Sequence, residues 1–228
     1  MSPSSYTQLL NFSSLMTSFV CHEVISPVGT ILNWLEIIEE ECNSNRQNYN
    51  PIKESAMQAT AKLKFVRLAF GMNSASGGEL SLKDAEIAID EFLRWEKSKV
   101  IWSSTNYVWP RTIVKLLLNL IFIANSTIPR GGVIQVHTGG TPTGFSITSV
   151  GKRAQIDEEL HKHLNAGSGA SHLEARFVQR AYTGLLAKVA SMSVRINKPQ
   201  PDKVEITANS SSKPSITVHS SYSDQPLP

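Results

Sequence analysis

A long series of apolar side chains at steps of three and four residues is the feature that most constrains how this chain folds. Such spacing places the side chains along one face of a helix, which we expect to run from about Ser4 to Cys42. Pro27 lies inside the series, and a proline in a helix interior costs roughly 3 kcal/mol because it removes one N–H and displaces the carbonyl of Glu23. A kink is therefore expected near Glu23. The series consists of Leu9, Phe12, Met16, Phe19, Val28, Ile31, Leu35 and Ile38.

A second helix is expected after the polar loop formed by residues 43–50. Asn50 would be its N-cap and Pro51 its first helical residue, and Gly71 would end it. Its apolar residues alternate steps of four and three, as in a heptad seam. They are Ile52, Ala56, Ala59, Leu63, Val66 and Phe70. Two long helices with a short connection predict an antiparallel hairpin.

A hairpin of two helices cannot bury an apolar face on each helix by itself. We therefore expect two copies of the chain to pair through their hairpins, which makes the predicted assembly a homodimeric four-helix bundle. The alternative is that the hairpin packs on the C-terminal part of its own chain.

The chain divides into a hairpin (residues 1–72), a Gly/Ser-rich linker (73–80), a second domain (81–207) and a Ser/Pro-rich tail expected to be disordered (208–228). Within the second domain, helical and alternating segments follow one another, which predicts a two-layer α/β sandwich and an α+β protein overall. Helices are expected from Ser81 (in a capping box) to Lys97, after Pro110, at 156–164 and at 173–190; strands are expected at 100–102, 133–137, 145–150, 194–196 and 204–206.

Composition excludes several classes of protein. The net charge of +3, without a Lys/Arg run, is too small to predict nucleic-acid binding. The apolar stretch 116–124 is broken by Asn119 and is shorter than the ~20 residues that span a membrane. Cys21 and Cys42 would lie about 30 Å apart on one helix and cannot pair within it. With no secretory signal visible, we expect a soluble protein of the reducing cytoplasm.

His22 lies three residues after Phe19, about 60° from the apolar stripe at 100° per residue. A lone histidine on a helix is usually only a polar surface residue. Its neighbours form the pattern His-Glu-x-x-Ser-Pro-x-x-x-Ile from His22 to Ile31, which resembles the H-box of sensor histidine kinases. Together with the helix end Arg-Leu-Ala-Phe-Gly at 67–71, it resembles the ChpT-type histidine phosphotransferases of alphaproteobacterial phosphorelays. The resemblance covers about the first 205 residues.

In kinases an ATP-binding domain normally follows the H-box hairpin. The second domain of this chain resembles that domain in the order of its elements but differs from it at the residues that bind ATP. In the segment that resembles the kinase N-box, Asn119 to Ala124, the Mg²⁺-binding asparagine is replaced by Ile123, which offers no oxygen ligand. In the segment that resembles the Asp-x-Gly-x-Gly box, Ser149 replaces the aspartate and Arg153 the second glycine. The resemblance thus implies a degenerate, Bergerat-like domain that binds no ATP, and no cofactor is expected on this chain.

The histidines of the second domain do not form a pattern suited to binding a metal ion. His161 and His163 are two residues apart on a predicted helix and point away from each other. No metal site is expected.

The resemblance implies that His22 carries a phosphoryl group between aspartates of response-regulator receiver domains, which would supply the Mg²⁺. Glu23 would orient or deprotonate the imidazole, and Arg67 would hold the phosphoryl group or a partner's acid. The bland alternative for Arg67 is a solvated surface arginine. The residues expected to contact a receiver, or else to form a solvent-facing stripe, are Ser26, Pro27, Gly29, Thr30 and Asn33.

The expected partners are the receiver domain of a hybrid histidine kinase and cell-cycle response regulators of the CtrA type. Two other functions are left open by the sequence. One is a non-catalytic dimeric adaptor derived from a kinase, which would tolerate loss of His22. The other is an active kinase with a divergent ATP site, which would bind Mg-ATP.

Overall fold

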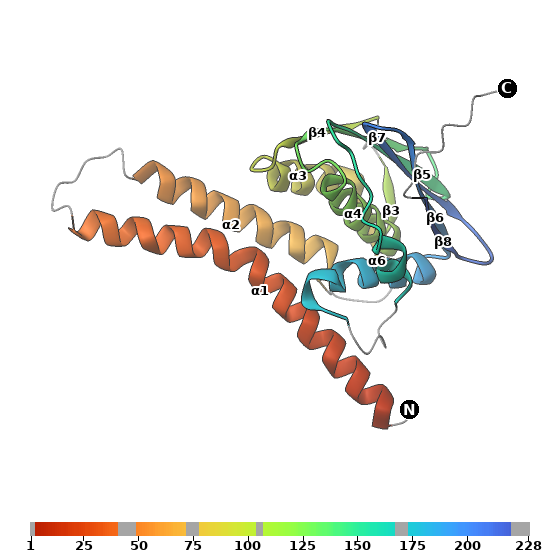
Figure 1. Ribbon diagram of the computed structural model, residues 1–228, viewed down its shortest axis with the longest axis horizontal. Coiled ribbons are helices and arrows are strands. Elements are labelled where there is room, and N and C mark those ends of the chain that lie inside the picture. Colours follow the sequence, from red (N-terminus) through yellow and green to blue (C-terminus); the bar gives the residue numbers. More distant parts are fainter. Residues whose placement is uncertain (1–2, 41–48, 72–77, 104–106, 167–172, 220–228) are drawn as a thin grey trace.

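The N-terminal part of the chain is an antiparallel hairpin of two helices, α1 (Pro3–Glu40) and α2 (Tyr49–Ala69) (Figure 1). The computed structural model describes residues 3–40, 49–71, 78–103, 107–166 and 173–219. The predicted helix end at Cys42 and the loop residues 43–48 therefore lie outside the described residues. The predicted N-cap at Asn50 is wrong, because α2 already begins at Tyr49.

Pro27 lies inside α1 and is buried, yet the helix continues on both sides of it. Figure 1 shows α1 changing direction about midway along its length. Because prolines are a common cause of sharp bends in helices, this agrees with the kink expected near Glu23.

α1 is also the one helix, among the described residues, that is long and apolar enough to cross a membrane, over Thr7–Ile38. Polar residues interrupt its apolar series, so no continuous apolar run marks α1 as a membrane span in the sequence. Length and composition are weak evidence here, since a core helix of a soluble bundle meets the same criteria. α1 packs along α2 and carries a carboxylate that forms an ion pair with it.

The second domain is a two-layer α/β sandwich, as predicted. Its helices are α3 (Leu82–Leu93), α4 (Arg111–Ser126), α5 (Leu160–Asn165), the 3₁₀ turn η2 (Ala175–Phe177) and α6 (Val178–Val189). Its strands are β1 (Glu79–Ser81), β2 (Ser98–Trp102), β3 (Val108–Pro110), β4 (Gly132–Thr138), β5 (Gly144–Val150), β6 (Met192–Gln200), β7 (Lys203–Ser210) and β8 (Ile216–His219).

Six of the strands form one sheet in the order β2-β4-β5-β7-β6-β8, and β1 pairs with β3 in a small second sheet. The β2–β4 and β6–β8 pairs are parallel and the other pairs are antiparallel. Figure 1 shows α3, α4 and α6 together on one side of the large sheet. α4 is buried along nearly its whole length, as its apolar sequence predicted.

Several predicted boundaries need correction. The capping box is present, because the Ser81 side chain accepts a hydrogen bond from the Lys83 N–H at 3.1 Å, but its helix ends at Leu93 and not at Lys97. The linker expected at 73–80 ends in strand β1, while 73–77 lie outside the described residues. The tail expected to be disordered from residue 208 instead completes β7 and forms β8, and only 220–228 are undescribed.

Aromatic side chains join the hairpin to the second domain. Phe65 of α2 is 1% exposed and its ring stacks on Phe122 of α4 with a centroid distance of 6.0 Å. Phe19 of α1 meets the rings of Phe70 and Phe122 at 5.6 and 6.1 Å. One face of the hairpin thus packs on its own chain, which was the alternative to dimerisation raised by the sequence.

A second face of α1 stays uncovered in the single chain. Its apolar side chains are 40–68% exposed and fall within an arc of about 80° at 100° per residue. Exposed apolar surface of this extent is typical of an interface with another protein. The residues are Leu10, Ile25, Val28, Leu32 and Leu35.

Candidate functional site

His22 is exposed on α1 and lies outside the uncovered apolar arc, about 100° from its centre. No hydrogen bond or ion pair within the described part of the chain engages its imidazole. The ring is therefore accessible to an incoming group. Counting equally from the loop at 43–50 predicts that His22 lies level with Phe70 and Gly71. The Glu23–Lys62 and Phe19–Phe70 contacts instead place it about one turn closer to the loop, near Leu63 to Arg67.

Glu23 points into the interface between the two helices of the hairpin. Its Oε2 lies 3.1 Å from Nζ of Lys62, and the two side chains are only 20% and 15% exposed. Lys62 was not predicted from the sequence. The only signal for it was the register of the hairpin, and the expected register was off by about a turn.

A polar, small-residue surface extends from His22 toward the loop. Ser26, Thr30 and Asn33 are exposed, and the Thr30 hydroxyl donates to the Ser26 carbonyl at 3.1 Å. A Cβ added at Gly29 would meet nothing within 4 Å, so the chain itself does not require glycine there. Together with His22 these residues cover an arc of about 100°, separate from the apolar arc.

The structure does not bring the other two candidate residues to the imidazole. Pro27 is buried between the helices and is not free to touch a partner. Arg67 is exposed on α2, five residues and hence about 140° round the helix from Lys62, and no contact joins it to His22 in the described residues.

Buried amides fix the end of α2 against the second domain. The Asn119 side chain donates to the carbonyls of Ala69 at 3.2 Å and Lys115 at 2.9 Å, and its own Oδ1 accepts from Gln179 at 3.0 Å. Lys115 donates to the Gly71 carbonyl at 2.5 Å. Burial, reinforced by nearby Arg111, lowers the pKa of Lys115. From the sequence, Asn119 was expected only as the first residue of the segment that resembles the N-box.

The positions that would bind ATP in a kinase are filled by packed side chains. Ile123 is 2% exposed, and buried Ser149 donates its hydroxyl to the Ala124 carbonyl at 3.2 Å. Arg153 keeps a positive φ of 60° at the position of the lost glycine. Gly151 is required by close packing, because a Cβ there would lie 2.5 Å from the Gly131 carbonyl oxygen.

A polar cavity of about 360 Å³ lies between the end of α4, the segment after β5 and α6. Asp157 and Glu158 line it, and Asp157 is paired with Arg180 at 2.8 Å. Because Arg180 compensates Asp157, the carboxylate of Glu158 gives the wall a net negative charge, which disfavours a polyphosphate. The described residues contain no cluster of three His, Cys, Asp or Glu side chains suited to a metal ion. The Gly-Ser-Gly segment at 167–169, whose sequence only weakly resembles a phosphate-binding glycine loop, lies outside them.

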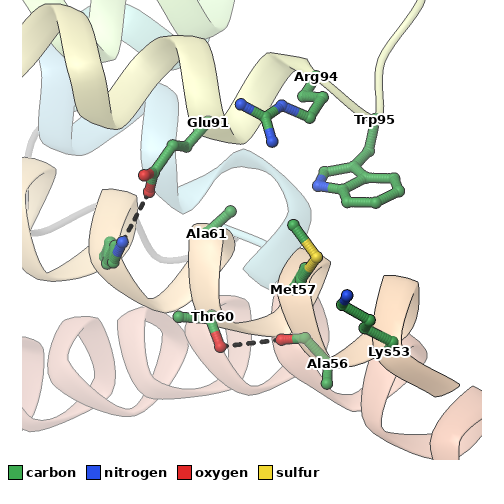
Figure 2. A pocket seen from close by; sticks show the side chains of 9 residues that line it. Lys53, Ala56, Met57, Thr60, Ala61, Glu91, Arg94 and Trp95 are labelled. Carbon is green, nitrogen blue, oxygen red and sulfur yellow. Dashed lines mark hydrogen bonds and ion pairs between the residues drawn. The ribbon is translucent and has the colours of Figure 1, made fainter.

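A second cavity of about 300 Å³ lies between α2 and α3, away from the residues predicted to bind a partner (Figure 2). Figure 2 shows Lys53, Met57, Arg94 and Trp95 around it. Across the same groove Lys64 pairs with Glu91 at 2.9 Å. The groove exists only because α3 packs on the hairpin, so the separate helix patterns gave no sign of it.

Comparisons with known proteins agree with this architecture. Residues 82–202 match the family model of the histidine phosphotransferase C-terminal domain. The chain is 38% identical over 197 residues to the protein phosphotransferase ChpT of Brucella abortus (strain 2308), covering 86% of this chain and 94% of that protein. The solved structure of a bacterial phosphotransferase has a TM-score of 0.76 and 34% identity, covering 92% of this chain and 98% of that one. The histidine kinase AdeS of Acinetobacter baumannii is more distant, with a TM-score of 0.41 and 14% identity, over 83% of this chain and 97% of that one.

Proposed function

Because this chain belongs to the ChpT family of histidine phosphotransferases, we propose that it relays phosphoryl groups between receiver domains of response regulators through His22. The observation that carries the proposal is the exposed imidazole of His22, which has no partner among the described residues and lies beside a polar surface of small residues. That surface leaves room for a partner's backbone and side chains to approach the ring.

In the proposed reaction, a ring nitrogen of neutral His22 attacks the phosphorus of a receiver's aspartyl phosphate. The P–O bond to the aspartate breaks, the carboxylate leaves with its electron pair, and an N–P bond forms. Neutral imidazole is a competent nucleophile. Transfer to a second receiver reverses these steps. The receiver brings the Mg²⁺ that neutralises charge in the loose transition state.

We also propose that two chains form a homodimer through the uncovered apolar arc of α1. This arc and the His22 surface occupy different sides of the helix, so pairing would leave both imidazoles exposed. The hairpin (residues 1–72) would then serve both dimerisation and transfer.

The chain is further proposed not to bind ATP. Ile123 offers no metal ligand, and the Ser149 hydroxyl is already used within the fold. Phosphoryl groups would therefore arrive only from receivers. The proposed donor is the receiver of a hybrid histidine kinase, the proposed acceptors are CtrA-type cell-cycle regulators, and the proposed location is the cytoplasm.

The test uses the purified protein and its His22→Ala variant, each mixed with a ³²P-labelled receiver and separately with labelled Mg-ATP. We expect label on the wild type only, from the receiver only, labile to acid and stable to base. Label from Mg-ATP alone would show an active kinase instead. Binding of receivers by both proteins without any label would show an adaptor.

A further inference from the structure

A charged pair inside the hairpin lies directly beside His22. Glu23 follows His22 in α1, and its carboxylate is held by Lys62 of α2 at 3.1 Å in a largely buried position. A carboxylate next to the attacked imidazole matters, because a phosphoryl group carries close to two negative charges near neutral pH. An unpaired carboxylate at this place would repel that group over a short distance.

Resting on the relay proposed above, we propose that Lys62 is a positioning residue that holds Glu23 between the helices and cancels its negative charge beside His22. This assigns Glu23 a role other than base. Its Oε2 is engaged by Lys62, and successive residues on a helix do not face each other. The pair is neutral as a whole, so it lets His22 accept a doubly negative group.

The experiment measures the rate at which a ³²P-labelled receiver phosphorylates His22 in four full-length proteins: wild type, Lys62→Met, Glu23→Gln and the double variant. Lys62→Met leaves a carboxylate without its partner and should slow acceptance about tenfold, equivalent to ~1.4 kcal/mol. Glu23→Gln removes the negative charge and should react at least as fast as wild type. The double variant has neither charge and should return to near the wild-type rate.

Two other roles for the pair predict different patterns, and either pattern would overturn the proposal. A purely structural tie between the helices is lost in all three variants, so all three would be slowed alike. A catalytic base at Glu23 is lost in Glu23→Gln and in the double variant, so those two would be slow whatever residue occupies position 62.

Two further variants serve as controls. Lys62→Arg keeps the cation and should retain the wild-type rate. Lys64→Met breaks the exposed pair with Glu91, which spans 2.9 Å in the groove between α2 and α3, and should also leave the rate unchanged. Circular dichroism and light scattering confirm that each variant keeps its fold and oligomeric state.

Failure of this inference is distinguishable from failure of the relay itself. If wild type takes no label from any receiver, the relay and this inference fall together. If wild type is labelled at His22 while Lys62→Met is labelled equally fast, only the role of Lys62 falls.

Discussion

Asn119 is a fully buried amide that connects three helices: its own α4, α2 through the Ala69 carbonyl, and α6 through Gln179. Asn119→Ala removes these side-chain bonds and leaves the buried Ala69 carbonyl without its donor, while the Gln179 amide keeps the Asn119 backbone carbonyl and the Thr183 hydroxyl as acceptors. We expect a loss of about 2–3 kcal/mol in the free energy of unfolding, measured by urea denaturation. The control is Asn165→Ala, whose exposed amide donates, within the described residues, to the His161 carbonyl alone. This variant should cost less than about 0.5 kcal/mol. Equal small losses in both variants would contradict the assignment.

His163 should make stability depend on pH. Its side chain is 6% exposed and stacks on Phe177 with a centroid distance of 3.8 Å. Burial, with the charge of Arg180 added, lowers the pKa of His163, while Glu159 and Asp157 oppose the shift. The folded state therefore binds its proton at lower pH than the unfolded state, for which the pKa is near 6.5. The contribution of neutral His163 to the free energy of unfolding is therefore fully present above pH 6.5. It is lost as the pH falls from 6.5 toward the pKa of the folded state.

The comparison is between the free energies of unfolding at pH 7.5 and 5.5. As the pH falls, the free energy of unfolding of the wild type should decrease by at most about 1.4 kcal/mol per pH unit through the titration of this residue. His163→Gln should lose less between the two pH values, whereas His161→Gln, on the exposed side of the same helix, should behave as wild type. An unchanged slope in His163→Gln would rule out this residue as the cause.

Single residues also show where the sequence was informative. His22, Ser26 and Asn33 could be placed on one side of a helix from spacing alone, and the structure puts them there, exposed, with the half-buried Gly29 among them. Lys62 could not be found, because its relation to Glu23 depends on the relative register of two helices. That register is set by packing, and counting residues from a loop fixes it only to about a turn.

The two sides of α1 can be tested separately with neighbouring residues. Leu32 is 55% exposed within the apolar arc, and Asn33 is exposed on the His22 surface. Leu32→Glu buries two carboxylates in the proposed dimer interface and should yield monomers in size-exclusion chromatography with light scattering. Asn33→Glu should remain dimeric but bind receivers more weakly, because it adds charge where a partner approaches. A dimeric Leu32→Glu protein would exclude this face as the interface.

The helices and strands differ in how well their positions can be predicted from the sequence. The helix starting after Pro110 and the strands β4 and β5 were predicted closely, because apolar runs and flanking glycines mark them locally. β8 was missed because its segment is rich in Ser and Pro, and it becomes a strand only by pairing in parallel with the distant β6. The apolar seam predicted for α2 accounts for only one of its two packed faces. Phe65, Leu68 and Ala69, related by steps of three and four residues, form a second stripe that packs into the core of the C-terminal domain.

For the whole molecule, the aromatic cluster around Phe65 determines whether hairpin and C-terminal domain behave as one unit. The ring centroid of Phe65 lies 4.4 Å from that of Phe92 in α3 and 6.0 Å from that of Phe122 in α4. The ring centroids of Phe70 and of Tyr182 in α6 are 5.3 Å apart. These rings and the buried Asn119 bonds are the main contacts between the two parts. Burial among them accounts for the raised pKa of Tyr182.

Phe65→Ala should therefore uncouple the hairpin from the domain. Replacing a buried phenylalanine by alanine costs about 3–5 kcal/mol. Here the lost contacts lie between the hairpin and the C-terminal domain, so the hairpin can separate locally and admit solvent. Hydrogen exchange read by mass spectrometry should show α2 amides exchanging much faster than in wild type, while β5 and β7 stay protected. Ile87→Ala, at a residue 48% exposed on α3, should change neither region. If α2 and the central strands lose protection together in Phe65→Ala, the two parts form one cooperative unit, and the position of His22 is fixed by the fold of the whole chain.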